Sequence, residues 1–251
     1  MRVCIPKENG QRFKTLLMSL SPTLTNIVLK FTQDGLHVSE SNVAQTILIS
    51  FFFEKEFFSQ FDMEECDIIK IPLLTFNQIL KHCDLKDDLI IEFDKNNRDV
   101  LGIAFDNCEF EIKLLYSDES SQVTIPDYNG VIFELNSNEF QKCVKRLFEF
   151  TEDVYIEKVK DKNQLLFSSL KSTSSDSNCK LNLVCNINEN SNINSITKQK
   201  CISTKYMNII SKNYTFSPII KIHFFNDFPL LFEYTYNNCY LRCYIMGKME
   251  E

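Results

Sequence analysis

The chain has few of the residues on which many enzymes depend. Its 251 residues include five glycines, three histidines and no tryptophan. So few glycines leave little room for backbone loops that cradle phosphates, and no G-x-S-x-G or H-E-x-x-H motif is present. The paired acids Asp87 and Asp88 fit a charged surface turn. We therefore expect no catalytic residue and no cofactor. These absences argue against the alternative that the protein is an enzyme.

Metal sites and membrane spans are also poorly supported. The ten cysteines include no C-x-x-C pair, and with three histidines a metal-ligand cluster is hard to build. Most cysteines lie inside helix or strand patterns, so we interpret them as small core residues in a reducing compartment. No uninterrupted apolar stretch reaches about 18 residues, so we expect no membrane partner. The net charge of −7 by itself argues against nucleic acid.

A helical pattern, apolar at i, i+3, i+4 and i+7, recurs along the chain. Successive copies begin 63, 64 and 66 residues apart. Such positions fall on one face of a helix, and a regular period predicts a repeated structural unit. The copies are Phe13, Leu16, Leu17 and Leu20; Phe76, Ile79, Leu80 and Cys83; Phe140, Cys143, Val144 and Leu147; and a weaker one with Tyr206, Ile209 and Ile210, which Asn213 breaks.

These copies predict four short helices with strands between them. The helices span Gln11–Leu20, Thr75–His82, Asn138–Glu149 and Ile202–Lys212, and Thr75 and Asn136 are candidate N-caps. Glu109–Tyr116 and Cys179–Ile187 alternate apolar and polar residues, which is typical of half-buried strands. Asn237 and Asn238 predict a tight hairpin turn before a strand at Cys239–Met246.

The segment Ser117–Gly130 is polar, acidic and rich in turn residues, and it lies at the midpoint of the repeats. We therefore predict domains at residues 1–117 and 131–251, joined by a connector at residues 118–130. Each domain would hold two units of one helix plus several strands. The fold class is thus α+β with two similar domains.

Positive charge is concentrated in the predicted helices, and negative charge in the rest of the chain. The predicted helices hold eight bases and two acids, a net +6, so the remainder carries −13. Surface helices often carry lysine for solubility, but four basic helices in an acidic protein favour a phosphate-binding track. The candidate DNA-facing residues are Arg12, Lys14, Lys81, Lys142, Lys145, Arg146, Lys205 and Lys212.

Several segments resemble the sliding clamps of the proliferating cell nuclear antigen family. LLTFNQILKHCD from Leu73, NSNEFQKCVKRL from Asn136 and TKYMNIISK from Thr204 are similar to the family's second, third and fourth helices. SESNVAQ from Ser39 resembles a segment near its partner pocket. The most specific match is DFPLLFEYTYNNCYLRCYIM from Asp227, which resembles its C-terminal hairpin.

The resemblance implies a DNA-clamp fold, with helices lining the hole of a ring and antiparallel sheets outside. It implies a homotrimer that encircles double-stranded DNA without reading its sequence. It also implies partners, namely DNA polymerase, other proteins with clamp-binding peptides, and an ATP-dependent clamp loader. The expected location is the nucleus, or a viral replication site if the protein is viral.

Two further surfaces follow from matching positions. The partner-peptide pocket would comprise Val43, Ile125, Pro126, Tyr128, Pro229, Tyr244, Ile245 and Met246. The subunit interface would comprise Phe110, Ile112, Leu114, Cys179, Leu181 and Leu183, although both strands also fit ordinary internal positions. Gly247 stands where the family usually has proline, and Met246 is bulkier than its usual residue. Lys160 matches a lysine that relatives modify, and it also fits a plain solvated residue.

Three other functions remain open at this point. The chain fits a subunit of a hetero-oligomeric checkpoint clamp, or a viral processivity factor that works as a monomer or dimer. It also fits a protein-interaction module without a DNA role. Oligomeric state and loading on circular DNA distinguish them.

Overall fold

The computed structural model describes residues 1–63, 65–84, 86–94, 99–116, 131–159, 162–169, 181–187, 200–225 and 229–248. The chain divides into two compact units. The first comprises Met1–Val43, Ile49–Thr124 and Asn237–Leu241, and the second comprises Ala44–Leu48, Ile125–Tyr236 and Arg242–Glu251. The predicted connector at residues 118–130 lies outside the described residues.

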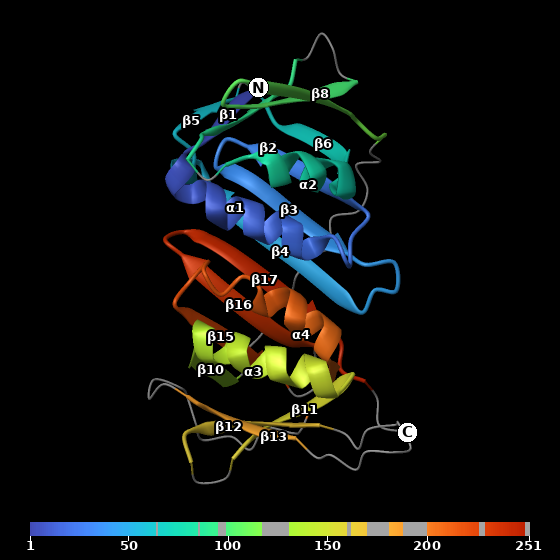
Figure 1. Ribbon diagram of the computed structural model, residues 1–251, viewed down its shortest axis with the longest axis vertical. Coiled ribbons are helices and arrows are strands. Elements are labelled where there is room, and N and C mark those ends of the chain that lie inside the picture. The colour runs from blue at the N-terminus through green and yellow to red at the C-terminus, as the bar shows by residue number, and fades with distance from the viewer. Residues whose placement is uncertain are drawn as a thin grey trace. The chain divides into compact units, whose positions relative to one another are not determined.

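In the first unit, helices α1 (Lys7–Leu20) and α2 (Leu73–His82) pack against each other and cover one face of a sheet (Figure 1). That sheet has the strand order β6-β2-β3-β4 within this unit, and a second sheet has the order β5-β1-β7-β8-β9. The strands are β1 (Arg2–Ile5), β2 (Asn26–Thr32), β3 (Gly35–Ser41), β4 (Ile47–Glu54), β5 (Gln60–Asp62), β6 (Asp67–Pro72), β7 (Leu89–Glu92), β8 (Val100–Phe105) and β9 (Cys108–Lys113), with a 3-10 helix at Lys55–Phe57.

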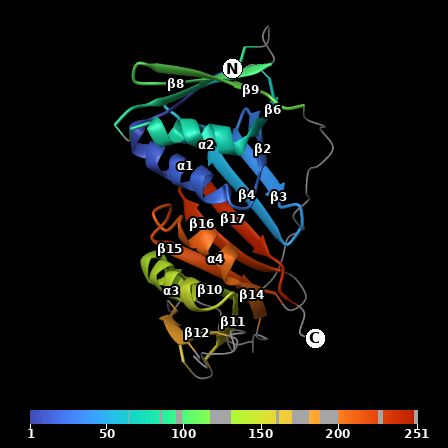
Figure 2. The same cartoon turned by 45° about the vertical axis from the view of Figure 1, so that its right-hand side comes forward.

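The second unit repeats this plan. Helices α3 (Ser137–Phe150) and α4 (Thr204–Ser211) pack together over a sheet of order β10-β15-β16-β17, which Figure 2 shows from a second direction. A smaller sheet has the order β13-β12-β11-β14. The strands are β10 (Val131–Asn136), β11 (Asp153–Lys158), β12 (Gln164–Ser169), β13 (Asn182–Asn186), β14 (Lys200–Ser203), β15 (Ile219–Phe224), β16 (Leu230–Tyr236) and β17 (Cys239–Ile245).

A phenylalanine from the first helix of each unit anchors its core. In the first unit the ring of Phe13 lies 5.7 Å from that of Phe53 in β4 and 6.4 Å from that of Phe76 in α2. In the second, the ring of Phe140 lies 5.9 Å from that of Phe232 in β16 and 6.3 Å from that of Phe167 in β12. Aromatic pairs at these separations bury large apolar areas. The apolar stripes predicted from the repeat therefore face the two cores.

The predicted α+β class is confirmed, and all four helices are present with shifted ends. The prediction that Asn136 is an N-cap is confirmed, because its Oδ1 accepts from the backbone N–H groups of Asn138 and Glu139. The prediction for Thr75 is wrong, since α2 already begins at Leu73, whose N–H donates to the carbonyl of Thr25.

The fourth helix starts two residues later than predicted. Cys201 and Ile202 pair with β11 as part of β14, so the helix begins only at Thr204. Within α4 the core position belongs to Met207, which is fully buried, whereas Tyr206 is half-buried. The Tyr206 hydroxyl hydrogen-bonds to the Thr46 hydroxyl at 2.6 Å. Asn213, which breaks this copy of the stripe, is nevertheless buried, and its side chain donates to the Ile209 carbonyl at 3.3 Å.

Strand ends also differ from the alternation pattern. The predicted strand Glu109–Tyr116 ends at Lys113, because the N–H of Leu115 donates to the Lys70 carbonyl of β6 instead. Tyr116 is consequently exposed. The hairpin turn at Asn237 and Asn238 is confirmed, with Asn237 in the left-handed region at φ 51°.

Candidate nucleic-acid interface and partner surface

Six of the eight predicted DNA-facing residues have exposed side chains on three helices. Each helix turns its apolar stripe toward its sheet, so the bases occupy the opposite, solvated face. Because α1 packs beside α2 and α3 beside α4, each unit presents one two-helix surface (Figure 1). The exposed residues are Lys81 in α2, Lys142, Lys145 and Arg146 in α3, Lys205 in α4, and Lys212 at the end of α4. We call these six residues the basic track.

The two bases of α1 are placed differently. Both Arg12 and Lys14 are half-buried, and Arg12 Nε is enclosed. The Lys14 ammonium donates to the carbonyl of Cys83 at 2.7 Å and approaches that of Lys81 at 3.4 Å. These carbonyls end α2, where a cation is favourable. Lys14 therefore joins α1 to the end of α2.

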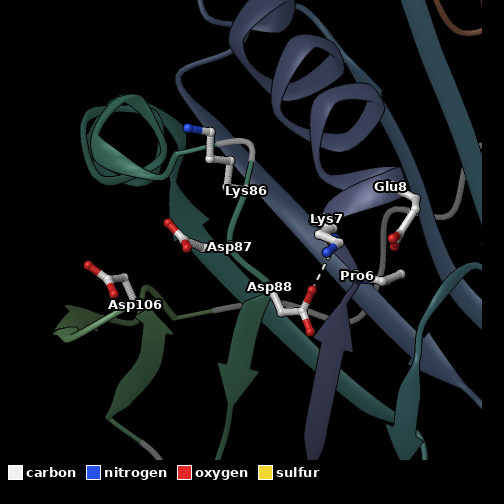
Figure 3. Close-up of a pocket in the computed structure, with 7 residues that line it drawn as sticks. All are labelled: Pro6, Lys7, Glu8, Lys86, Asp87, Asp88 and Asp106. Atoms are coloured by element: carbon white, nitrogen blue, oxygen red, sulfur yellow. Dashed lines mark hydrogen bonds between the residues drawn. The ribbon is translucent and has the colours of Figure 1, made fainter.

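An open hollow of about 450 Å³ lies beside the start of α1 (Figure 3). Six of its seven lining residues are charged, and the lining comprises Pro6, Lys7, Glu8, Lys86, Asp87, Asp88 and Asp106. The α1 N-cap residue, Pro6, provides no side-chain cap, and Asp88 Oδ1 instead accepts from the Lys7 backbone N–H at 2.9 Å. A carboxylate at a helix N-terminus accepts a hydrogen bond from a backbone N–H that has no partner within the helix, and its negative charge interacts favourably with the helix dipole. Asp88 thus has a capping role, and this also explains why α1 starts before the predicted Gln11.

Strands β9 and β13, which carry the candidate interface residues, each lie at the end of their strand order. In β9 the side chain of Ile112 is buried within its own unit, whereas Phe110 is half-buried and stacks on Phe105 at 5.5 Å. Leu114, Leu181 and Leu183 are also half-buried. The remaining candidate, Cys179, lies outside the described residues. An edge strand offers unpaired backbone groups to another chain.

The candidate pocket residues are only partly described. Ile125, Pro126 and Tyr128 lie outside the described residues, as does Lys160. Val43 is fully exposed and belongs to the first unit. In the second unit Tyr244 and Ile245 are buried, Pro229 is half-buried and Met246 is exposed. Alternation along β17 therefore turns Ile245 into the core and Tyr244 to the other face of the sheet.

Tyr244 belongs to an apolar cluster that the sequence patterns did not identify. It packs with Phe225 and Leu231, and the half-buried Leu48 packs against them. We call these four residues the Tyr244 cluster. They come from separate segments of the chain, so no local spacing could have indicated them.

A buried, ion-paired carboxylate lies on the same face of this sheet as Tyr244, and the sequence patterns did not predict it either. Glu233 of β16 accepts from Arg242 Nε at 2.6 Å and lies 3.1 Å from His223 Nε2. Burial by itself raises the pKa of Glu233, but the hydrogen bonds and charges of His223 and Arg242 outweigh it and lower that pKa to about 2. The ring of His223 also stacks on that of Phe225. The available sequence signal was a single acid inside an apolar strand.

Within the described ranges, no group of three or more His, Cys, Asp or Glu side chains could hold a metal ion. None of the described helices combines the length and apolar character needed to cross a membrane. What the described surface offers is exposed bases, edge strands and an apolar cluster.

Comparison with known proteins points to one family. A family profile described as the C-terminal domain of proliferating cell nuclear antigen matches residues 124–249. A protein of Paramecium bursaria Chlorella virus 1 named probable DNA polymerase sliding clamp 1 is 22% identical over 241 residues, covering 90% of this chain and 88% of its own length. The proliferating cell nuclear antigen of Caenorhabditis elegans is 21% identical over 259 residues, covering 97% and 95%.

Solved structures of the same family share the fold. The chain matches the Entamoeba histolytica proliferating cellular nuclear antigen with a TM-score of 0.85 and 20% identity, covering 99% of this chain and 98% of that one. It matches a chain of the PCNA2–PCNA3 complex from Sulfolobus tokodaii with a TM-score of 0.83 and 17% identity, covering 99% of both.

Proposed function

Since this chain belongs to the proliferating cell nuclear antigen family, we propose that it is a DNA sliding clamp that holds DNA polymerase on its template. The supporting observation is the basic track, which places exposed cations on three helices of a chain with net charge −7. In this proposal the protein acts by binding and by topology rather than by catalysis. Its site of action is the nucleus, or a viral replication site.

The basic track suits contact with phosphates rather than bases. Lysine and arginine side chains neutralise backbone phosphates without reading sequence, and such contacts weaken with salt. A clamp that slides needs this weak, uniform attraction, because strong base contacts would stop it at particular sites. The negative charge of the rest of the chain repels DNA, so DNA would approach the helical surface only.

Retention on DNA requires a closed ring, which we propose forms by pairing β9 of one copy with β13 of the next. Both strands end their sheets in the described chain, and both carry half-buried apolar side chains. Such head-to-tail contacts close into a ring when the rotation per subunit fits, and three copies are expected. Opening this ring on DNA is the proposed task of an ATP-dependent loader.

Partner proteins are proposed to bind near the Tyr244 cluster through short peptides with aliphatic and aromatic anchors. The half-buried Pro229 directly precedes β16, and the exposed Met246 directly follows β17, the strand that carries Tyr244. DNA polymerase is the first expected partner.

The DNA track is tested by a charge-matched pair of triple variants. Lys81→Ala/Lys145→Ala/Lys205→Ala removes one cation from each of three helices, and Lys55→Ala/Lys86→Ala/Lys162→Ala removes three exposed lysines elsewhere. After loading on nicked circular DNA, the first variant should be retained about tenfold less in moderate salt, and the second should match the wild type. Equal retention of the two variants would contradict a role for the basic track in holding DNA.

Ring closure is tested by light scattering. The wild type should have about three times the 29.4 kDa mass of one chain. Phe110→Asp on β9 should lower this mass toward that of a single chain, while the far-UV circular dichroism spectrum remains that of the folded protein. Leu74→Asp also places a carboxylate at an exposed apolar position, on α2, and should leave the mass unchanged. A monomeric wild type at micromolar concentration would contradict ring closure.

A further inference from the structure

The second unit brings two buried thiols together from distant parts of the chain. Cys143 lies on the buried face of α3 and Cys185 lies in β13, and their exposed fractions are 6% and 5%. In the sheet register Cys185 is opposite Leu165, so both project from the same face. Phe167, two residues along β12, projects from that face as well and contacts Phe140 of α3. The side chain of Cys185 therefore points at the helix.

The two thiols face each other where α3 packs on β13, and both are free. The opposite shifts of their pKa values arise from a hydrogen bond between the two sulfur atoms. Disulfide formation requires two cysteines that already face each other closely, because the S–S bond is short and its geometry is narrow. The helix–strand packing of α3 on β13 supplies this juxtaposition.

Their hydrogen bond makes the two sulfurs unequal. Accepting the hydrogen bond from Cys143 lowers the pKa of Cys185, whereas donating it, together with burial, raises the pKa of Cys143. The thiolate is the reactive form of cysteine, so Cys185 is the expected nucleophile and Cys143 the expected second thiol.

We propose that Cys143 and Cys185 form a redox site at which hydrogen peroxide produces a disulfide that ties α3 to β13. The Cys185 sulfur attacks one oxygen of the peroxide, the O–O bond breaks, and Cys185 becomes a sulfenic acid as the first water leaves. The Cys143 sulfur then attacks the Cys185 sulfur, the S–O bond breaks, and the second water leaves with the Cys143 proton. Two thiols are oxidised by two electrons, and one peroxide is reduced to two waters.

The position of the pair gives the disulfide a structural consequence. β13 has one partner strand in the described sheet, β12, and a covalent bond to α3 would hold this edge to the body of the unit. An effect on ring closure rests on the proposed function, because it requires β13 to be the interface strand. The disulfide itself requires only the contact between the two sulfurs.

The test uses the full chain carrying Cys66→Ser, Cys108→Ser and Cys179→Ser. The first two cysteines are exposed, and the third is close to Cys185 in sequence, so these changes remove competing partners. The protein is treated with hydrogen peroxide, remaining thiols are alkylated, and a non-reducing digest is examined by mass spectrometry. We expect most of the Cys143 peptide to be joined to the Cys185 peptide, with a loss of about 2 Da and reversal by dithiothreitol.

Two single variants and a matched control sharpen the result. Cys143→Ser should leave a sulfenic acid on Cys185 that dimedone traps, whereas Cys185→Ser should leave Cys143 largely unmodified. Cys243→Ser changes another buried cysteine of the same unit and should leave the cross-link intact. The proposal is overturned if both thiols of the folded protein remain alkylatable after peroxide, or if they reach only sulfinic and sulfonic acids. Because the readout is a peptide mass, it does not depend on ring formation.

Discussion

Arg242 and Glu233, on the neighbouring strands β17 and β16, form a close ion pair in which Arg242 Nε donates to Glu233 Oε1 at 2.6 Å. The Glu233 side chain is only 8% exposed, and His223 of β15 contacts its other oxygen. One carboxylate therefore connects three strands of the sheet. A buried charge that loses its partners is costly, so this contact is a sensitive point of the second unit.

We predict that Glu233→Gln lowers the free energy of unfolding by about 3 kcal/mol, because it leaves Arg242 and His223 without the carboxylate charge. Chemical denaturation monitored by circular dichroism measures the change. Glu134→Gln is the matched control, since Glu134 makes a more open pair with Lys221 at 3.8 Å in the same sheet. The control should change stability by less than about 0.5 kcal/mol. Equal effects of the two variants would contradict a special role for Glu233.

The same carboxylate predicts a pH dependence. The pKa of Glu233 falls to about 2 in the folded protein from an ordinary 4.5, so the native state favours the ionised form. Its contribution of about 3 kcal/mol is therefore fully present above pH 4.5 and is lost as the pH falls from 4.5 toward 2. Denaturation midpoints measured across this range should fall more steeply for the wild type than for Glu233→Gln. Parallel curves would show that another group controls acid unfolding.

Lys14 and Lys81 should separate stability from DNA retention. Lys14→Ala removes the cation that binds the last carbonyls of α2, so it should cost about 0.5–1 kcal/mol of stability. Lys81→Ala removes an exposed cation and should be nearly neutral in stability while weakening retention on circular DNA. Thermal melting and loading assays on both variants test this. A stability loss at Lys81 as large as that at Lys14 would be inconsistent with the structure.

Two glycines should respond to alanine in opposite directions. Gly35 has φ +146°, and an added Cβ would lie 2.1 Å from the carbonyl oxygen of Phe53, so Gly35→Ala should cost about 3 kcal/mol. Gly10 lies inside α1 with nothing within 4 Å of the added atom, so Gly10→Ala should stabilise by about 0.5–1 kcal/mol. Denaturant midpoints distinguish the two. A neutral Gly35→Ala would show that the turn rearranges.

Asn136 provides a test of helix capping. Its side chain accepts two backbone hydrogen bonds at the start of α3, so Asn136→Ala should lower stability by about 1 kcal/mol, and Asn136→Asp should retain most of it. Ser203 occupies the equivalent position of α4 without a capping hydrogen bond, and Ser203→Ala is the control. Urea unfolding should show a smaller loss for the control than for Asn136→Ala.

Local periodicity was sufficient to predict the four helices and their buried faces, but not the short strands β1, β5 and β14. An apolar stripe such as Phe140, Cys143, Val144 and Leu147 can be stable in water only when it is buried, so its spacing predicted both the helix and the side that packs. The same logic predicted the exposed positions of Lys145 and Lys205. Helix ends were less accurate, because α1 depends on Asp88 and α4 depends on strand β14, and neither lies within the local pattern.

The amino-acid sequence by itself determined the α+β class, the repeat, the buried stripes and the concentration of positive charge on the helices, because each depends on spacing along a few turns or one strand. Only the tertiary structure decided that Lys14 binds carbonyls while Lys81 stays free in water, that Glu233 is ion-paired, and that Cys143 meets Cys185. Those outcomes depend on which side chains approach across long stretches of chain. Residue type and local period carry no information about such distances.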